Sequence, residues 1–122
     1  MESRYLYRAK RSDNKEWVEG NLIQTSYGAC FINTNEPDKI PDTIEVDPST
    51  VCQCVGYEGI FDGDIFQCHG ERYVISWCDA YLSWRAYAVF SSESISLGEF
   101  RPWDIDVIGN KIDNPELMEV EA

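Results

Sequence analysis

Five cysteines and a single histidine are the residues that metal or thiol chemistry would use in this sequence. Structural zinc sites take pairs of cysteine or histidine ligands separated by roughly two to four residues. The pairs here have other spacings, Cys-x-Cys and adjacent Cys-His, so we predict no metal site. Adjacent strand residues face opposite ways, which places the histidine poorly for activating the thiol beside it. The residues are Cys30, Cys52, Cys54, Cys68, Cys78 and His69.

Two carboxylates, Asp62 and Asp64, flank Gly63 and would suit general acid/base work or a hard cation. Both uses need further converging ligands. A Gly-Asp pair just before a strand more commonly closes its turn by hydrogen bonding to the loop backbone. We therefore interpret Asp62, Gly63 and Asp64 as a structural turn, and we expect Asp64→Ala to destabilise the protein rather than to abolish a reaction.

Glycine spacing excludes the common phosphate-binding loops. Gly56, Gly59 and Gly63 fit neither the dinucleotide-binding nor the P-loop pattern, and no serine nucleophile elbow is present. With no assembled catalytic set, we predict no catalytic residues, no cofactor and no enzymatic activity.

Aromatic residues are dense in the C-terminal half of the chain. Most are expected in the core, but Tyr81 and Trp103 lie near predicted loops and are candidates for an exposed shelf on which a peptide or a base stacks. Glu99, Asp104 and Asp106 complete this candidate interaction surface. They belong to an acidic stretch. A protein that mimics DNA would also need carboxylates of this kind along an exposed face.

The net charge of −12 is unevenly distributed. Residues 1–20 carry five basic and four acidic side chains, so the remainder carries nearly all of the negative charge. Phosphate backbones repel such a chain, and nucleic acid is a disfavoured partner. The alternative function is nucleic-acid binding through a basic strip of Arg4, Arg8, Lys10 and Arg11.

The odd cysteine count and the absence of an apolar export signal after Met1 predict reduced thiols in a cytoplasm. No apolar run approaches the roughly 20 residues that span a bilayer, so we expect no membrane association.

Short runs of alternating apolar and polar residues, separated by turn residues, indicate a mainly β fold, a barrel or a sandwich. Gly20 predicts a bulge or kink in its strand. Residues 33–42, with Pro37 and Pro41, form an expected exposed loop, and Asn114 with Pro115 could start a short helix. Strands are expected at residues 5–9, 17–24, 29–32, 43–46, 51–55, 64–68, 72–77, 83–90, 95–97 and 103–108.

Four segments, in order along the chain, form a recognisable pattern. They are Tyr7-Arg8-Ala9-Lys10-Arg11 with Asn14 to Gly20, Glu45 to Gly56, Ile60 to Ile65, and Val107 to Leu117. In these segments, and over about residues 5–118, the sequence resembles the YopX family of small phage and prophage proteins. The last segment, similar to the family's closing Ile-Gly-Asn-x-x-x-Asn-Pro-Glu-Leu, is the most specific. Between Gly56 and Ile60 the turn is shorter than in most family members.

The resemblance implies a mainly β fold with an N-terminal β-hairpin region, an SH3-like barrel in the C-terminal half and a short C-terminal helix. We predict a single domain over 1–122, with an N-terminal β subregion of about residues 1–48 and the barrel and tail over about 49–122. The resemblance implies a phage or prophage context but no activity.

We therefore expect a non-enzymatic accessory protein in the bacterial cytoplasm that binds a host or phage protein. Exposed strand edges also favour self-association into a homo-oligomer.

Overall fold

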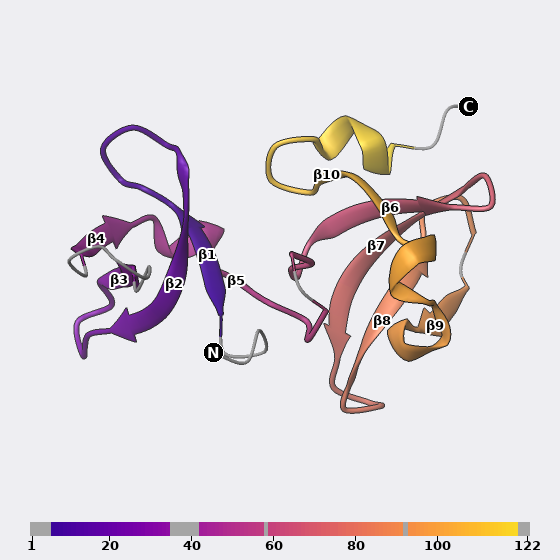
Figure 1. The fold of residues 1–122 in the computed structure, drawn as a ribbon, viewed down its shortest axis with the longest axis horizontal. Helices are drawn as coiled ribbons and strands as arrows, with labels where there is room; N and C mark the ends of the chain where they lie inside the picture. The colour runs from indigo at the N-terminus through magenta and orange to yellow at the C-terminus, as the bar shows by residue number, and fades with distance from the viewer. Residues whose placement is uncertain (1–5, 35–41, 58, 92, 120–122) are drawn as a thin grey trace. The chain divides into compact units, whose positions relative to one another are not determined.

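The computed structural model describes residues 6–34, 42–57, 59–91 and 93–119. Arg4, Tyr5 and the greater part of the proline-containing loop predicted at 33–42 lie outside these ranges. The backbone contacts divide the chain into two compact units, Met1–Phe61 and Asp62–Ala122. The sequence placed its internal boundary earlier, near residue 48. Each unit holds one five-stranded antiparallel sheet (Figure 1), so the mainly β prediction is confirmed.

The sheet of Met1–Phe61 has the strand order β4-β3-β2-β1-β5. Its first two strands form the expected hairpin, and β5 pairs with β1 although some forty residues separate them. The strands are β1 (Tyr7–Lys10), β2 (Trp17–Gln24), β3 (Cys30–Thr34), β4 (Asp42–Val46) and β5 (Cys52–Gln53).

Strand β2 changes its partner at Gly20. Tyr7 of β1 lies opposite Gly20, and from Asn21 onward the strand pairs with β3 instead. The prediction at this glycine was a bulge or a kink, and neither register contains a bulge. The glycine is needed because the backbone of Asn33 approaches so closely that a Cβ atom would lie 2.3 Å from its carbonyl oxygen.

This sheet curls until the ends of β1 and β4 meet. Arg11 forms an isolated antiparallel bridge with Val46, the Ser12 amide donates to the Glu45 carbonyl, and the Asp47 amide donates to the Lys10 carbonyl. The curl buries one face of the sheet around a small apolar core. Its fully buried members are Ala9, Cys30, Ile32 and Val46, with Tyr7, Val18, Leu22 and Val51 packed against them.

The sheet of Asp62–Ala122 has the order β10-β6-β7-β8-β9, in which four consecutive strands form a meander and β10 returns to pair with β6 (Figure 1). Among the residues described, no closure of this sheet into a barrel is detected. The structure therefore shows an antiparallel sheet here, and the SH3-like barrel stays a prediction. The strands are β6 (Asp64–Cys68), β7 (Glu71–Cys78), β8 (Ser83–Ala88), β9 (Ser94–Ser96) and β10 (Asp106–Asn110).

The β6–β7 hairpin closes with a two-residue turn made by His69 and Gly70. Both have positive φ angles, 51° and 84°, as the type I′ turn favoured by twisted hairpins requires. His69 is exposed at this turn. The core behind this hairpin contains Ile65, Phe66, Ile75, Ala86 and Leu97.

The described residues contain four short 3-10 turns, and two of them, η4 and η5, stand where other elements were predicted. The turns are η2 (Pro48–Thr50), η3 (Leu97–Glu99), η4 (Pro102–Asp104) and η5 (Pro115–Met118). The strand predicted at 103–108 is wrong in its first half, because Pro102 starts η4 and β10 begins only at Asp106. The predicted terminal helix is a 3-10 turn, and the described ranges contain no α-helix. They contain no helix long and apolar enough to cross a membrane.

Candidate functional site

The end of the β7–β8 hairpin presents a group of large apolar side chains, Trp77, Tyr81, Leu82 and Trp84, which we call the hairpin-end patch. Trp77 and Trp84 are cross-strand partners whose rings meet edge to face at 5.4 Å. Trp77 is 45% exposed, Tyr81 68% and Leu82 75%. Trp84 and its partner Trp77 lie on one face of the hairpin. Arg85 follows Trp84 and therefore points to the other face, where its guanidinium lies beside the Tyr81 ring. Exposed large apolar side chains at one hairpin end commonly mark an interaction surface.

Polar contacts hold two of these rings in position. The indole Nε1 of Trp77 donates to Asp79 Oδ1 at 2.9 Å. The guanidinium of Arg85 lies 4.4 Å from the centre of the Tyr81 ring, while its nitrogens donate to the hydroxyl and the carbonyl of Ser94. An anchored Arg85 thus limits the conformations of Tyr81, and an ordered aromatic ring costs less entropy to bind.

Of the other predicted surface residues, Glu99, Trp103 and Asp104 lie between β9 and β10, and Asp106 is the first residue of β10. Trp103 is 77% exposed and its ring lies 5.7 Å from the Arg101 guanidinium. Glu99 and Asp106 are exposed, and Asp104 is half-buried. The sequence placed Trp103 and Tyr81 in one surface, but they belong to different segments. Trp77 was missed because a strand pattern alone does not show which face of a hairpin end remains open. Leu82 was missed although it lies in the same turn as Tyr81.

The basic strip is largely occupied by contacts within the protein. The Arg8 guanidinium lies 4.7 Å from the Trp17 ring centre and 4.6 Å from that of Phe61, and the Lys10 ammonium lies 5.3 Å from Trp17. These cations are thus already engaged with aromatic rings.

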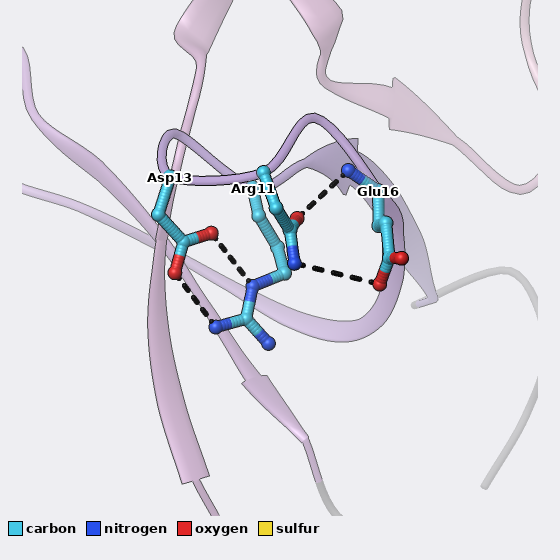
Figure 2. Close-up of polar contacts among 4 residues, drawn as sticks. Arg11, Asp13 and Glu16 are labelled. Atoms are coloured by element: carbon cyan, nitrogen blue, oxygen red, sulfur yellow. Dashed lines mark hydrogen bonds and ion pairs between the residues drawn. The ribbon is translucent and has the colours of Figure 1, made fainter.

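Arg11 is bound by a carboxylate. It donates two hydrogen bonds to Asp13, each 2.9 Å long, while its backbone amide donates to the Glu16 carbonyl (Figure 2). The hydrogen bond from Arg11 holds the pKa of the Asp13 carboxyl below its usual value. The pair is exposed, and it leaves little positive field for a phosphate.

Asp62 and Gly63 lie in a tight turn that enters β6 at Asp64. Gly63 has a φ of 86°, its amide donates to the Ile75 carbonyl at 2.9 Å, and its carbonyl accepts from the Lys111 amide at 2.9 Å. Glycine adopts this left-handed conformation without strain. Within the described ranges, no three His, Cys, Asp or Glu side chains converge as metal ligands would.

Asp64 has 1% of its surface exposed, and the structural role of its carboxylate stays a prediction. We expect Asp64→Ala to lower the free energy of unfolding by about 2 kcal/mol, because a buried carboxylate has partners that alanine would leave unsatisfied. Thermal melting followed by circular dichroism measures this. A melting temperature equal to that of the wild type would show that the carboxylate has no structural role.

The buried thiols contact the backbone. Cys52 Sγ donates to the Thr50 carbonyl and Cys54 Sγ to the Tyr57 carbonyl, both at 3.3 Å. All five cysteines are free, and four of them are buried. Burial raises the pKa of the Cys68 thiol, so this group stays protonated and unreactive.

Cys78 differs from these thiols because it is half-exposed and its thiolate is stabilised. A hydrogen bond from the Tyr87 hydroxyl is the main cause of a lowered pKa of Cys78. Hydrogen bonds from the backbone N–H groups of Tyr81 and Ala80 lower this pKa further. A lowered pKa means that more thiolate is present at any pH below the usual thiol titration. We therefore expect iodoacetamide to alkylate Cys78 before the buried cysteines, with a pH midpoint below that of an ordinary thiol.

Tyr87→Phe tests the cause of this reactivity. Loss of the hydroxyl should raise the pKa of Cys78, move the alkylation midpoint to higher pH and slow labelling severalfold near neutral pH. Peptide mass spectrometry of time points gives the rate at each cysteine. Identical pH profiles for the two proteins would assign the reactivity to exposure alone.

The segment from Gly109 to Leu117 is a loop held by side-chain to backbone hydrogen bonds. The Asn110 side-chain oxygen accepts from the amides of Ile112 and Asp113, and the Asn114 side-chain oxygen accepts from the Asn110 amide at 3.2 Å. The sequence expected Asn114 as a helix N-cap; its position is right, but its side chain makes no capping bond to η5.

This loop requires a glycine at position 109, because a Cβ atom on Gly109 would lie 2.6 Å from Asn114 Oδ1 and 2.9 Å from Leu117 Cδ1. We expect Gly109→Ala to cost about 2 kcal/mol of stability through overpacking. Hydrogen exchange at the Asn110 and Leu117 amides should quicken with it. Gly98→Ala is the matched control, because its nearest neighbour would be 3.8 Å away. Equal stability of the two variants would contradict the expectation.

These observations define a mainly β protein built from two five-stranded antiparallel sheets. The chain belongs to the YopX family: the family model described as YopX protein matches residues 6–119. This confirms the resemblance found in the sequence, and the match extends over both compact units. No curated protein and no solved structure matches the chain.

Proposed function

We propose that this protein is a non-enzymatic module that binds another protein through the hairpin-end patch. The observation that carries the proposal is the exposure of three large apolar side chains at the end of one hairpin, Trp77 on one face, Tyr81 on the other and Leu82 in the turn. Tryptophan and tyrosine bury much area on binding and lose little conformational freedom, which is why they dominate the energetics of protein interfaces. Two rings that are already held by Asp79 and Arg85 suit this role.

Nucleic acid is the weaker candidate partner. The basic strip would need free guanidinium and ammonium groups to displace counterions from phosphates. Arg8 and Lys10 are instead engaged with Trp17, and Arg11 with Asp13. The net charge of −12 opposes the same encounter.

We extend the proposal to the cellular setting, which membership of the YopX family supports. A phage or prophage protein acts in the bacterial cytoplasm, where its partner is a host or phage protein. We also propose an SH3-like arrangement for Asp62–Ala122, supported by a last strand, β10, that returns past 3-10 turns to pair with the first strand, β6. Self-association through the edge strands β9 and β10 is part of the same proposal.

A comparative pull-down tests the binding function. Tagged wild type, a Tyr81→Ser/Leu82→Ser variant and a Tyr27→Ser control are expressed in cells carrying the phage or prophage, and captured proteins are quantified by mass spectrometry. Tyr27 is 81% exposed and belongs to the other unit, Met1–Phe61. A partner should be recovered with wild type and control and lost with the patch variant. Recovery that is equal in all three would exclude the hairpin-end patch.

A further inference from the structure

A cleft of about 440 Å³ lies in the unit Asp62–Ala122, lined by Arg72, Phe90, Glu116, Leu117 and Glu119. Arg72 comes from the start of β7, Phe90 from the turn after β8, and Glu116 with Leu117 from η5. The hairpin-end patch begins at Trp77, five residues further along the same strand. Five residues of strand span about 17 Å, so the cleft is a separate site.

The walls of the cleft combine one exposed ring with two carboxylates. Phe90 is 53% exposed, and Glu116 and Glu119 are exposed. Against these two negative charges the lining contributes one positive charge, that of Arg72. The potential in the cleft is therefore negative, and an anionic ligand would meet repulsion there.

Arg72 shows which group this environment accepts. Its guanidinium lies 5.6 Å from the centre of the Phe90 ring, and its Nη1 donates to the Leu117 carbonyl at 3.3 Å. An aromatic ring and a carbonyl oxygen thus already hold one planar cation at this place. Glu116 and Glu119 carry two negative charges, one more than the single positive charge of Arg72 can balance.

We propose that this cleft binds an arginine side chain presented by a basic peptide segment of a partner protein. The incoming guanidinium lies between the Glu116 and Glu119 carboxylates, and its aliphatic part packs on Phe90 and Leu117. Arginine fits because its flat, weakly hydrated head pairs with carboxylates and stacks on rings at once. This proposal specifies the chemistry of a partner, and it rests on other residues than those of the hairpin-end patch.

A peptide titration followed by amide NMR shifts of the whole protein tests the proposal. The probe is a short blocked Gly/Ser peptide with one central arginine, and the second peptide carries citrulline, its neutral isostere, at that position. With only a few weak contacts we expect a dissociation constant of about 1 mM at low salt. The arginine peptide should shift the amides of Phe90, Leu117 and Glu119, and added salt should weaken its binding.

Charge variants separate the cleft from the overall field of an acidic protein. Glu116→Gln/Glu119→Gln should weaken arginine-peptide binding about fivefold, since two exposed ion pairs are lost. Glu19→Gln/Glu45→Gln changes the net charge equally, at residues of the unit Met1–Phe61 that do not line the cleft, and should bind like the wild type. The proposal is overturned if citrulline and arginine peptides bind alike, if the shifts fall on residues 77–84, if no shifts occur, or if both charge variants lose affinity equally. Loss of peptide binding at the cleft leaves the hairpin-end pull-down unaffected, whereas shifts on residues 77–84 would assign the peptide to the hairpin-end patch instead.

Discussion

Phe66→Ala is expected to cost about 4 kcal/mol of folding free energy, the largest loss of any single substitution considered for this protein. Phe66 is fully buried on β6. Its ring stacks on Tyr73, its partner on β7, at 5.3 Å and meets Phe100 edge to face at 5.1 Å. Removing it loses the apolar burial and both ring contacts, and leaves a cavity that two rigid strands cannot close.

Urea denaturation followed by tryptophan fluorescence measures this loss. Three of the four tryptophans lie in Asp62–Ala122, the unit that contains Phe66. Phe90→Ala is the matched control, because it removes the same ring from an exposed position and should cost less than about 1 kcal/mol. A similar shift of the midpoint in both variants would mean that the three-ring cluster adds nothing to stability.

Gly20→Ala is expected to destabilise the other sheet by about 3 kcal/mol, at the upper end for overpacking. The added methyl group would lie 2.3 Å from the Asn33 carbonyl oxygen, 2.9 Å from the Asn33 carbonyl carbon and 3.0 Å from Ile32 Cγ2. Two of these neighbours are backbone atoms of β3, so a side-chain rotation cannot relieve the overlap. The β2–β3 pairing must separate at the point where β2 changes partner.

The loss can be followed through Trp17, the single tryptophan of Met1–Phe61. Weaker protection of the Asn21 and Asn33 region in hydrogen exchange should accompany a lower urea midpoint. Gly98→Ala again serves as control, since its added methyl meets only Ser96 Oγ at 3.8 Å. A Gly20→Ala protein as stable as the wild type would show that β3 moves aside at no cost.

Local sequence signals predicted the hairpins well. Alternating residues on either side of His69 and Gly70 were sufficient to locate β6 and β7, because the turn chemistry and the strand period agree. The predicted strand at 83–90 was two residues too long. Val89 lies in the turn after β8, and its amide donates to the Arg72 carbonyl.

Features that depend on distant contacts were not predictable in the same way. Gly20 reads as a bulge from its neighbours in sequence, whereas its reason is the backbone of Asn33, thirteen residues away. The engagement of Arg8 by Phe61 requires two segments that only the folded sheet brings together. In the candidate site, Tyr81 was found because it lies in a loop, while Trp77 was missed because it lies on a strand.

The return of β10 to β6 affects how the protein emerges from the ribosome. Phe66 pairs with Val107, so one edge of β6 has no partner until about 40 further residues have been made. At about 5 to 20 residues per second, that edge waits for about 2 to 8 seconds. The β7–β8 hairpin can form during this interval and cover the other edge of β6 first. Nascent chains are therefore most open to mispairing along the β10 side, and each molecule closes this edge only after β10 has been made.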